Sequence, residues 1–286
     1  MFSQETVFTI NADHIAHYEA HLQEQERAKN TVKKYIHDLH AFIAFLDGQP
    51  VTKGTILAWK EYLADTYTPA TVNSMLAAVN GFFHFMDWAK LSVRPLKVQR
   101  PLFCDESREM TRAEYVRLVD AAQRQGNERL ALLLQTICAT GIRVSELRFI
   151  TVEAVALGRT VVSNKGKRRT IFLPGKLCVL LKKYLKKQKI TDGSVFVTRT
   201  GKPLDRSNIW RDMKALCESA GVEPDKVFPH NLRHLFARTY YSLEKDLSRL
   251  ADILGHSNIS TTRIYTAESG FVHARQMERL GLILTT

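Results

Sequence analysis

Apolar residues recur at intervals of three and four through segment 31–46, and this spacing constrains the first third of the chain more than any other feature. It places the residues on one face of an α-helix, which must be buried against other helices. The apolar positions are Val32, Tyr35, Ile36, Leu39, Phe42, Ile43, and Phe45 or Leu46. Similar patterns predict helices near 12–27, 55–65 and 70–89. Residues 1–90 are therefore expected to form a helical domain.

Segment 91–106 interrupts this pattern with Pro95 and Pro101 and with several basic residues. Proline removes a backbone donor and disfavours helical geometry in the residue before it. We therefore predict a linker over 91–106 and a second domain over 107–286. A chain of 286 residues is long enough to bury two separate cores.

The second domain is expected to combine helices with a small sheet. Thr111 and Glu114 form a capping-box pattern at a helix start. The basic turn NKGKR lies between two β-like runs, which predicts a hairpin with a positively charged tip. The other expected elements are a buried helix at 128–140, strands at 159–163, 169–174 and 194–199, and helices from 206 onward. The predicted fold class is mainly α with a small antiparallel β-sheet, in two domains.

The net charge of +12 is unevenly distributed. Residues 1–100 carry ten basic and ten acidic side chains, so the whole excess lies in 101–286. A basic domain beside a neutral one favours a polyanionic partner, with nucleic acid as the first candidate. The alternative is a soluble basic enzyme with no such partner.

The sequence also gives expectations about location and metals. The N-terminus lacks the features of a secretion signal, and no run approaches 18 apolar residues. The four cysteines form no C-x-x-C pair, which argues against a zinc site or a disulfide framework. We expect a cytoplasmic protein that spans no membrane.

Six side chains in the second domain are the types needed to cleave and rejoin a DNA phosphodiester without a metal. They are Arg143, Lys165, His230, Arg233, His256 and Tyr265, in the contexts ATGIRVSEL, NKGKRR, PHNLRH and LGHSNISTTRIYT. Guanidinium groups can grip phosphate oxygens bidentately, and a tyrosine hydroxyl can attack phosphorus once a neighbour accepts its proton. The fixed order of these residue types gives the pattern its specificity.

Each residue taken alone has a plainer interpretation. Arg143 can form a structural ion pair with Glu146, and Tyr265 can belong to the core. His230 and His234 have zinc-binding spacing, but Asn231 stands where a zinc protease needs glutamate. The pairs His17 with His21 and His37 with His40 are interpreted as ordinary polar positions.

Together, the motifs resemble the tyrosine recombinase (phage integrase) family, over roughly residues 105–270. The residues within these motifs are similar to those of Xer recombinases and of short integrases of mobile elements. The resemblance implies a SAM-like core-binding domain at 1–90 and a catalytic domain at 107–286. It places Arg143, His230, Arg233, His256 and Tyr265 at signature positions. Lys165 matches the hairpin lysine, with Lys167 as the alternative because the turn differs by one residue.

The resemblance further implies a reaction through a 3′-phosphotyrosyl link and a Holliday junction, with no metal, cofactor or ATP. The expected partners are double-stranded recombination sites, three further copies of the chain (a homotetramer, with a dimer on each site), and in some reactions a directionality factor. In the family, a C-terminal helix such as 270–284 is exchanged between protomers; here it can instead pack on its own domain. A bacterial, nucleoid-associated enzyme is expected.

Two roles are compatible with this resemblance: integration or excision of a mobile element, which we favour, and Xer-like resolution. Two other function classes remain as alternatives. One is a type IB topoisomerase-like nickase, which needs one protomer and one site. The other is a DNA-binding protein without catalysis, which the intact set of six residues disfavours.

Overall fold

The computed structural model describes residues 8–98, 106–164, 167–266 and 277–280. The chain divides into two compact units, Met1–Arg100 and Pro101–Thr286. Among the described residues, no helix is both long enough and apolar enough to cross a membrane.

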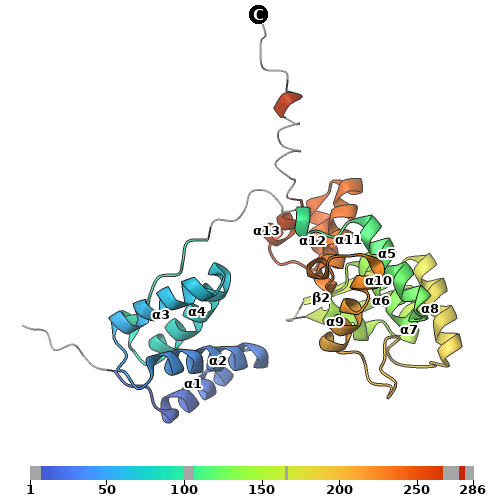
Figure 1. The fold of residues 1–286 in the computed structure, drawn as a ribbon. Coiled ribbons are helices and arrows are strands. Elements are labelled where there is room, and N and C mark those ends of the chain that lie inside the picture. Colours follow the sequence, from blue (N-terminus) through green and yellow to red (C-terminus); the bar gives the residue numbers. More distant parts are fainter. Residues whose placement is uncertain (1–7, 99–105, 165–166, 267–276, 281–286) are drawn as a thin grey trace, which may run out of the picture. The chain divides into compact units, whose positions relative to one another are not determined.

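The first unit is built from four helices (Figure 1). Their bounds are α1 (Ala12–Glu24), α2 (Lys29–Leu46), α3 (Lys53–Thr66) and α4 (Pro69–Phe85), followed by the 3₁₀ turn η1 (Ala89–Leu91). Thr52 caps α3 through its side chain, and Pro69 is the first residue of α4. The core contains the apolar face predicted for α2, including Leu39 and Phe42, both fully buried. The four predicted helices are confirmed.

The segment after η1 is fixed to α4, although the sequence suggested a linker there. The side-chain amide of Asn80 donates to and accepts from the backbone of Val93, at 2.8 and 3.0 Å. Asn73 makes the same pair of bonds with Leu96, at 2.9 and 2.6 Å. Residues 92–96 therefore belong to the first unit, because the side-chain amides of two asparagines on α4 hydrogen-bond to their backbone.

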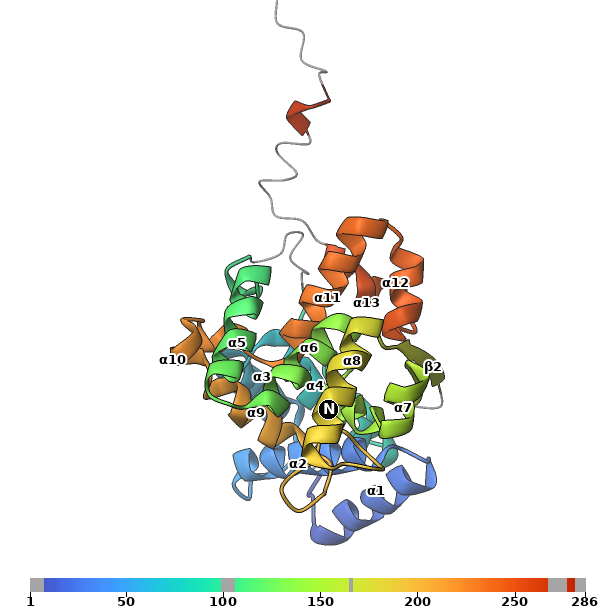
Figure 2. The same ribbon diagram turned by 90° about the vertical axis from the view of Figure 1, so that its right-hand side faces the viewer.

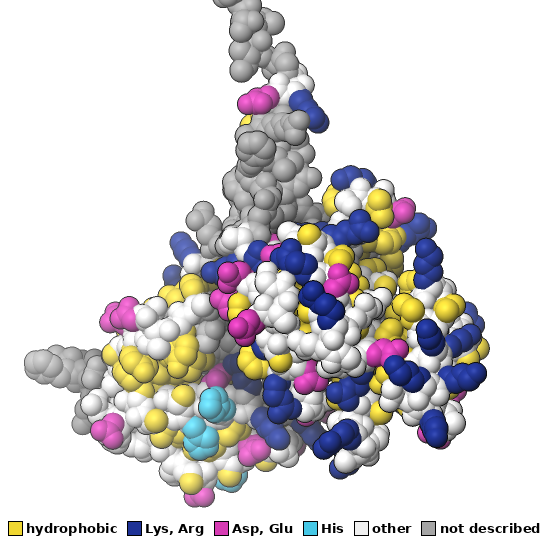
Figure 3. All heavy atoms as spheres, turned by 45° about the vertical axis from the view of Figure 1, so that its right-hand side comes forward, with side chains coloured by type: hydrophobic (Ala, Val, Ile, Leu, Met, Phe, Trp, Pro, Cys, Tyr) yellow, Lys and Arg dark blue, Asp and Glu magenta, His cyan; other side chains and the backbone are white. Residues whose placement is uncertain are grey.

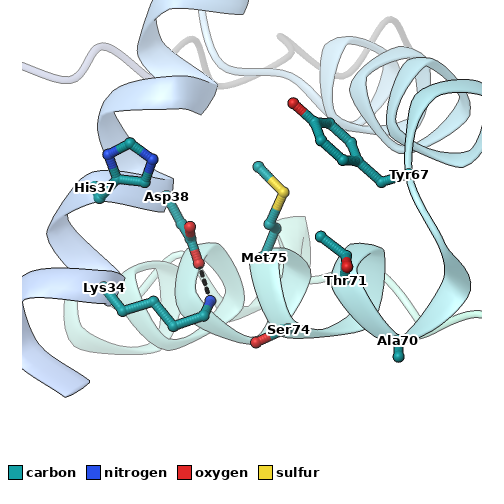
Figure 4. Close-up of a pocket in the computed structure, with 8 residues that line it drawn as sticks. All are labelled: Lys34, His37, Asp38, Tyr67, Ala70, Thr71, Ser74 and Met75. Carbon is teal, nitrogen blue, oxygen red and sulfur yellow. Dashed lines mark hydrogen bonds and ion pairs between the residues drawn. The ribbon is translucent and has the colours of Figure 1, made fainter. Parts of the chain in front are cut away.

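A pocket of about 440 Å³ opens between α2 and the start of α4 (Figure 4). The ion pair between Lys34 and Asp38 lies on its wall. The lining residues are Lys34, His37, Asp38, Tyr67, Ala70, Thr71, Ser74 and Met75. None of them belongs to the set of six expected to carry chemistry.

The second unit surrounds the buried helix α6. Its helices are α5 (Arg112–Arg124), α6 (Glu128–Thr140), α7 (Val152–Leu157), α8 (Gly175–Gln188), α9 (Arg206–Lys214), α10 (Cys217–Ala220), α11 (Pro229–Glu244), α12 (Leu247–Leu254) and α13 (Ile259–Thr262). Its 3₁₀ turns are η2 (Glu106–Arg108), η3 (Val144–Phe149), η4 (Pro224–Lys226) and η5 (Arg263–Thr266). Helix α6 packs against α5, α8 and α11, and most of its residues are buried. This matches the nearly all-round apolar pattern of 128–140.

The sheet of the second unit is one antiparallel hairpin, β1 (Arg159–Asn164) and β2 (Lys167–Phe172). Val162 faces Arg169 across the ladder, and both lie on the side of the hairpin that carries buried residues. The strand expected at 194–199 does not form; only isolated bridges at Ser194 and Val197 are present. The backbone of this segment instead hydrogen-bonds to Ile150, before α7, and to residues 202–204 that follow it. The side chains of Val195 and Phe196 are buried in the core.

Candidate active site

Arg233 is almost fully buried, one turn into α11. Pro229 begins this helix at its first position, as the sequence predicts. The guanidinium of Arg233 donates hydrogen bonds to the carbonyl oxygens of Gly141 at 2.5 Å and Leu254 at 2.7 Å. These carbonyls lie at the C-terminal ends of α6 and α12, where acceptors are left unpaired and partial negative charge accumulates. Two helix ends therefore stabilise a cation whose burial would otherwise be unfavourable.

Glu146 joins two further guanidinium groups. Its Oε1 lies 3.3 Å from Nη1 of Arg143, and the Arg143 backbone N–H donates to Oε2 at 2.9 Å. Arg169, on β2, donates to both carboxylate oxygens, at 2.9 and 2.6 Å. Burial raises the pKa of Glu146, but the hydrogen bonds and charges of the two arginines outweigh it and hold the pKa below its ordinary value. The carboxylate is therefore ionised at neutral pH.

Gly141 and Gly255 permit the close packing around these arginines. Both end a helix in the left-handed region, with φ of +62° and +64°. A Cβ at position 141 would lie 2.5 Å from the ring of Phe236, and one at position 255 would lie 2.8 Å from Cδ of Arg169. The glycines of the motifs ATGIR and LGH are therefore required for space as well as for conformation.

His256 follows Gly255 and contacts Arg233. Its Nε2 is 3.1 Å from Nη2 of Arg233, and its Nδ1 is 2.8 Å from Oγ1 of the buried Thr262. Because arginine only donates, Nε2 is the acceptor and Nδ1 carries the proton. Burial, together with the positive charges of Arg233, Arg143 and Arg169, lowers the pKa of His256 to about 4. The ring is therefore neutral at pH 7.

Tyr265 lies in η5 and is 5 % exposed. Its ring meets that of His234 edge-on, with centroids 4.7 Å apart, and stacks on His256 at 5.8 Å. Its apolar neighbours in the cluster are Ala237, Leu250 and Leu254. Tyr265 therefore belongs to a small core cluster and at the same time contacts two histidine rings. Asn258 caps α13, the short helix that precedes Tyr265.

His230 lies in the first turn of α11, with its ring 4.6 Å from that of His234. Loss of hydration, followed by repulsion from His234, Arg233 and Arg143, lowers the pKa of His230 to about 4. A neutral imidazole can accept a proton, so His230 is in the state that a general base requires at pH 7.

The site has an excess of positive charge. Arg143 and Arg169 share the carboxylate of Glu146, and Arg233 donates to two carbonyl oxygens and to the imidazole of His256, all of which are neutral. Burial and repulsion from Arg143 lower the pKa of Arg233 to about 10. A bound anion would relieve this repulsion, and two guanidiniums suit the oxygens of a phosphodiester.

The site residues lie on α11 and β2, at the start of η3, in the turn after α12, and in η5. Helices α11, α12 and α13 lie side by side in both ribbon views (Figures 1 and 2), and α12 packs against β2. Many Lys and Arg side chains are visible on the surface of this unit in the space-filling view (Figure 3). The charge excess inferred from the sequence is thus accessible to a polyanion.

Five of the six predicted residues meet in this site. His230, Arg233, His256 and Tyr265 are connected through ring contacts and hydrogen bonds. Arg143 joins them through its bond to the Gly255 carbonyl at 3.4 Å. Lys165 lies outside the described residues. Lys167 is the first residue of β2, and its side chain is also outside the description.

The sequence pattern did not assign two residues, Arg169 and His234, to the site. Arg169 belongs to the quoted motif NKGKRR, but only its pairing with Glu146 across the fold identifies it. His234 had been considered only as a zinc ligand, whereas it contacts Tyr265 and Glu109. The described part of the chain contains no group of three or more His, Cys, Asp or Glu residues suited to a metal ion.

Comparison with known families matches both units. Residues 108–270 match the model of the phage integrase family, and residues 15–90 match its N-terminal SAM-like domain. The tyrosine recombinase XerD of Lacticaseibacillus casei is 31% identical over 265 residues, covering 85% of this chain and 89% of that protein.

Two solved structures share the fold. A lambda integrase tetramer bound to a Holliday junction has a TM-score of 0.71 at 19% identity, covering 88% of this chain and 76% of that one. The Tn1549 transposon integrase in complex with transposon right end DNA has a TM-score of 0.69 at 17% identity, covering 93% and 99%. The phage integrase family model matches more than half of this chain. The chain therefore belongs to the phage integrase family of tyrosine recombinases, which are site-specific DNA recombinases.

Proposed function

We propose that Tyr265 is the nucleophile of this recombinase and that Arg143 and Arg233 bind the scissile phosphate. Tyrosine Oη attacks phosphorus, the bond from phosphorus to the 5′-oxygen breaks, and a 3′-phosphotyrosyl link forms. The link retains the energy of the broken bond, so a 5′-hydroxyl can later attack it and rejoin a strand without ATP. The observation that carries this proposal is the gathering of three guanidinium groups beside a buried tyrosine, where Arg143 and Arg169 share the carboxylate of Glu146.

The two histidines have different roles in this scheme. His230 is neutral at pH 7 and accepts the proton that leaves Tyr265. His256 presents an unprotonated Nε2 to Arg233 in the unliganded site, so it cannot yet donate from that atom. A phosphate bound to Arg233 raises the pKa of His256, which then donates to a phosphate oxygen in the transition state.

The departing 5′-oxygen needs a proton as the phosphorus bond breaks. Lys165 is the proposed donor, with Lys167 as the alternative. Both belong to or adjoin a hairpin whose second strand carries Arg169 into the site. No step uses a metal or another cofactor, because the guanidiniums stabilise the charge that develops on the phosphate.

The proposed partners are two double-stranded recombination sites, each bound by a dimer, in a homotetramer. The lambda integrase tetramer on a Holliday junction supports this assembly by shared fold. Segment 270–284, expected to be a helix exchanged between protomers, lies outside the described residues except for 277–280. A directionality factor and a place in the bacterial cytoplasm, on the nucleoid, are part of the same proposal.

For the biological role, we propose integration or excision of a mobile element. The shared fold with the Tn1549 transposon integrase supports it. The likeness to XerD supports the other role, Xer-like resolution, so the DNA around the gene is the deciding substrate.

The test uses supercoiled DNA that carries the chain's own gene and flanks, in EDTA, with an SDS quench. Wild-type protein should give a covalent complex and recombinant circles, and Tyr265→Phe should give neither while still binding DNA. Relaxed circles without recombinants would support a topoisomerase-like nickase. Covalent capture by Tyr265→Phe would refute the assignment of the nucleophile.

A further inference from the structure

We propose that Glu109 and His234 form a positioning pair that sets the ring of Tyr265 relative to His230. This inference deepens the proposed function, because it rests on Tyr265 as the nucleophile. Neither residue has a part in the steps described above. Both side chains are partly buried, and His234 contacts His230 and Tyr265, which do take part. The pair would act by geometry, without contact with the DNA.

The ring of His234 contacts both of the groups between which the proton must pass. Its ring centroid is 4.7 Å from that of Tyr265, with planes at 73°, and 4.6 Å from that of His230, with planes at 64°. A change in the orientation of His234 therefore displaces the nucleophile, the proton acceptor, or both. Misplacement of reacting groups by about 1 Å can lower a rate about 100-fold.

Glu109 fixes the orientation of His234. Its Oε1 lies 3.4 Å from Nδ1 of His234, and its Oε2 lies 3.3 Å from Nη2 of Arg238, one turn further along α11. The hydrogen bond with His234 is the main reason that the pKa of Glu109 lies below its ordinary value. An ionised carboxylate only accepts, so Nδ1 of His234 carries the proton and one tautomer is selected.

The backbone around Glu109 is itself attached to α11. The Asn231 amide donates to the Arg108 carbonyl at 3.0 Å, and Arg238 donates to the Met110 carbonyl at 2.6 Å. Met110 is fully buried. Residues 108–110 thus form a short strap across α11, and the carboxylate is held at its centre. A strap with bonds on both sides of Glu109 is a support suited to orienting an imidazole ring.

The first measurement needs no DNA. The protein would be labelled in its tyrosine rings, and Tyr265 would be assigned by the signal missing from Tyr265→Phe. Because Tyr265 lies between two imidazole rings, its ring resonances report on their orientation. We expect Glu109→Gln and His234→Phe to move the Tyr265 signal, while Thr239→Ala, on the exposed side of α11, leaves it in place.

The second measurement is single-turnover covalent capture on the supercoiled DNA described above. Glu109→Gln and His234→Phe should slow capture about 10- to 100-fold, with DNA affinity within about twofold of wild type. Glu109→Asp, which keeps the carboxylate, should recover part of the rate. A role limited to filling space would leave His234→Phe at the wild-type rate.

An unmoved Tyr265 signal in Glu109→Gln, or capture at the wild-type rate in both variants, would overturn the positioning pair. Thermal melting of each variant establishes that it is folded; if Glu109→Gln is not, His234→Gln replaces it in both measurements. If wild-type protein captures no DNA, the proposed function fails, and the tyrosine spectrum alone decides the inference.

Discussion

Glu146 binds Arg169 through a two-point ion pair, Oε1 to Nη1 at 2.9 Å and Oε2 to Nη2 at 2.6 Å. The two residues are distant in the sequence, and both side chains are largely removed from solvent. The pair attaches the hairpin to the turn that carries Arg143. It therefore links the proposed hairpin lysine to the phosphate-binding arginines.

Removal of the Glu146 carboxylate should be strongly destabilising. Glu146→Ala leaves Arg143 and Arg169 without their shared counter-ion, and loss of one partner of a buried pair costs about 3–5 kcal/mol. Denaturant unfolding measures this loss. The matched control is Glu128→Ala, which removes the exposed pair with Lys187 and should cost no more than about 1 kcal/mol. Equal losses in the two variants would contradict a structural role for the buried pair.

The stability of the free protein should depend on pH through His230 and His256. Both have a pKa lowered from 6.5 to about 4, so between these values the unfolded chain binds more protons than the folded one. Their contribution to stability is complete above pH 6.5 and is lost as the pH falls towards 4. Melting temperatures across this range test it. His256→Gln should flatten the profile, and His40→Gln on the exposed side of α2 is the control. A profile unchanged in His256→Gln would argue against a neutral, half-buried ring at this position.

The hairpin acid can be identified by changing the leaving group. Lys165→Ala and Lys167→Ala would be compared on DNA whose cleaved 5′-bridging oxygen is replaced by sulfur, once the site has been mapped. A thiolate departs without protonation because thiols are far more acidic than alcohols. We expect Lys165→Ala to lose about 100-fold or more on normal DNA and to recover on the sulfur substrate. Recovery confined to Lys167→Ala would transfer the role to that residue.

A methyl group at position 255 should lower the rate of covalent capture by more than the accompanying loss of folding stability explains. Gly255→Ala places a Cβ in a left-handed conformation, at about 1–2 kcal/mol, and against Arg169. Gly221→Ala is the matched control, because its φ is +60° and its Cβ would meet no atom within 4 Å. Both variants should lose similar backbone stability, and only Gly255→Ala should lose covalent capture. Equal capture by the two would show that the contact with Arg169 is not needed.

Local signals in the sequence predicted most elements, and five of the six residues that the sequence singled out meet in the site. Thr52 and Thr111 cap their helices as the side-chain patterns indicate, and Pro229 begins α11. Such signals depend on neighbours within one helical turn, so they are visible in a linear pattern. The pairs formed by Glu146 with Arg169 and by Glu109 with His234 depend on the folded chain and have no local signature. The same reason explains the absent strand at 194–199, where core burial outweighed strand propensity.

The asparagine bonds from Asn73 and Asn80 shorten the covalent tether between the two units. With residues 92–96 fixed to α4, nine residues, 97–105, separate Leu96 from the start of η2. Fully extended, such a tether reaches about 30–36 Å. In the proposed complex, once one unit binds a duplex, the other is confined near it at an effective concentration on the order of millimolar. Two individually weak DNA contacts would then behave as one strong contact, and the asparagines would contribute to DNA affinity without touching DNA.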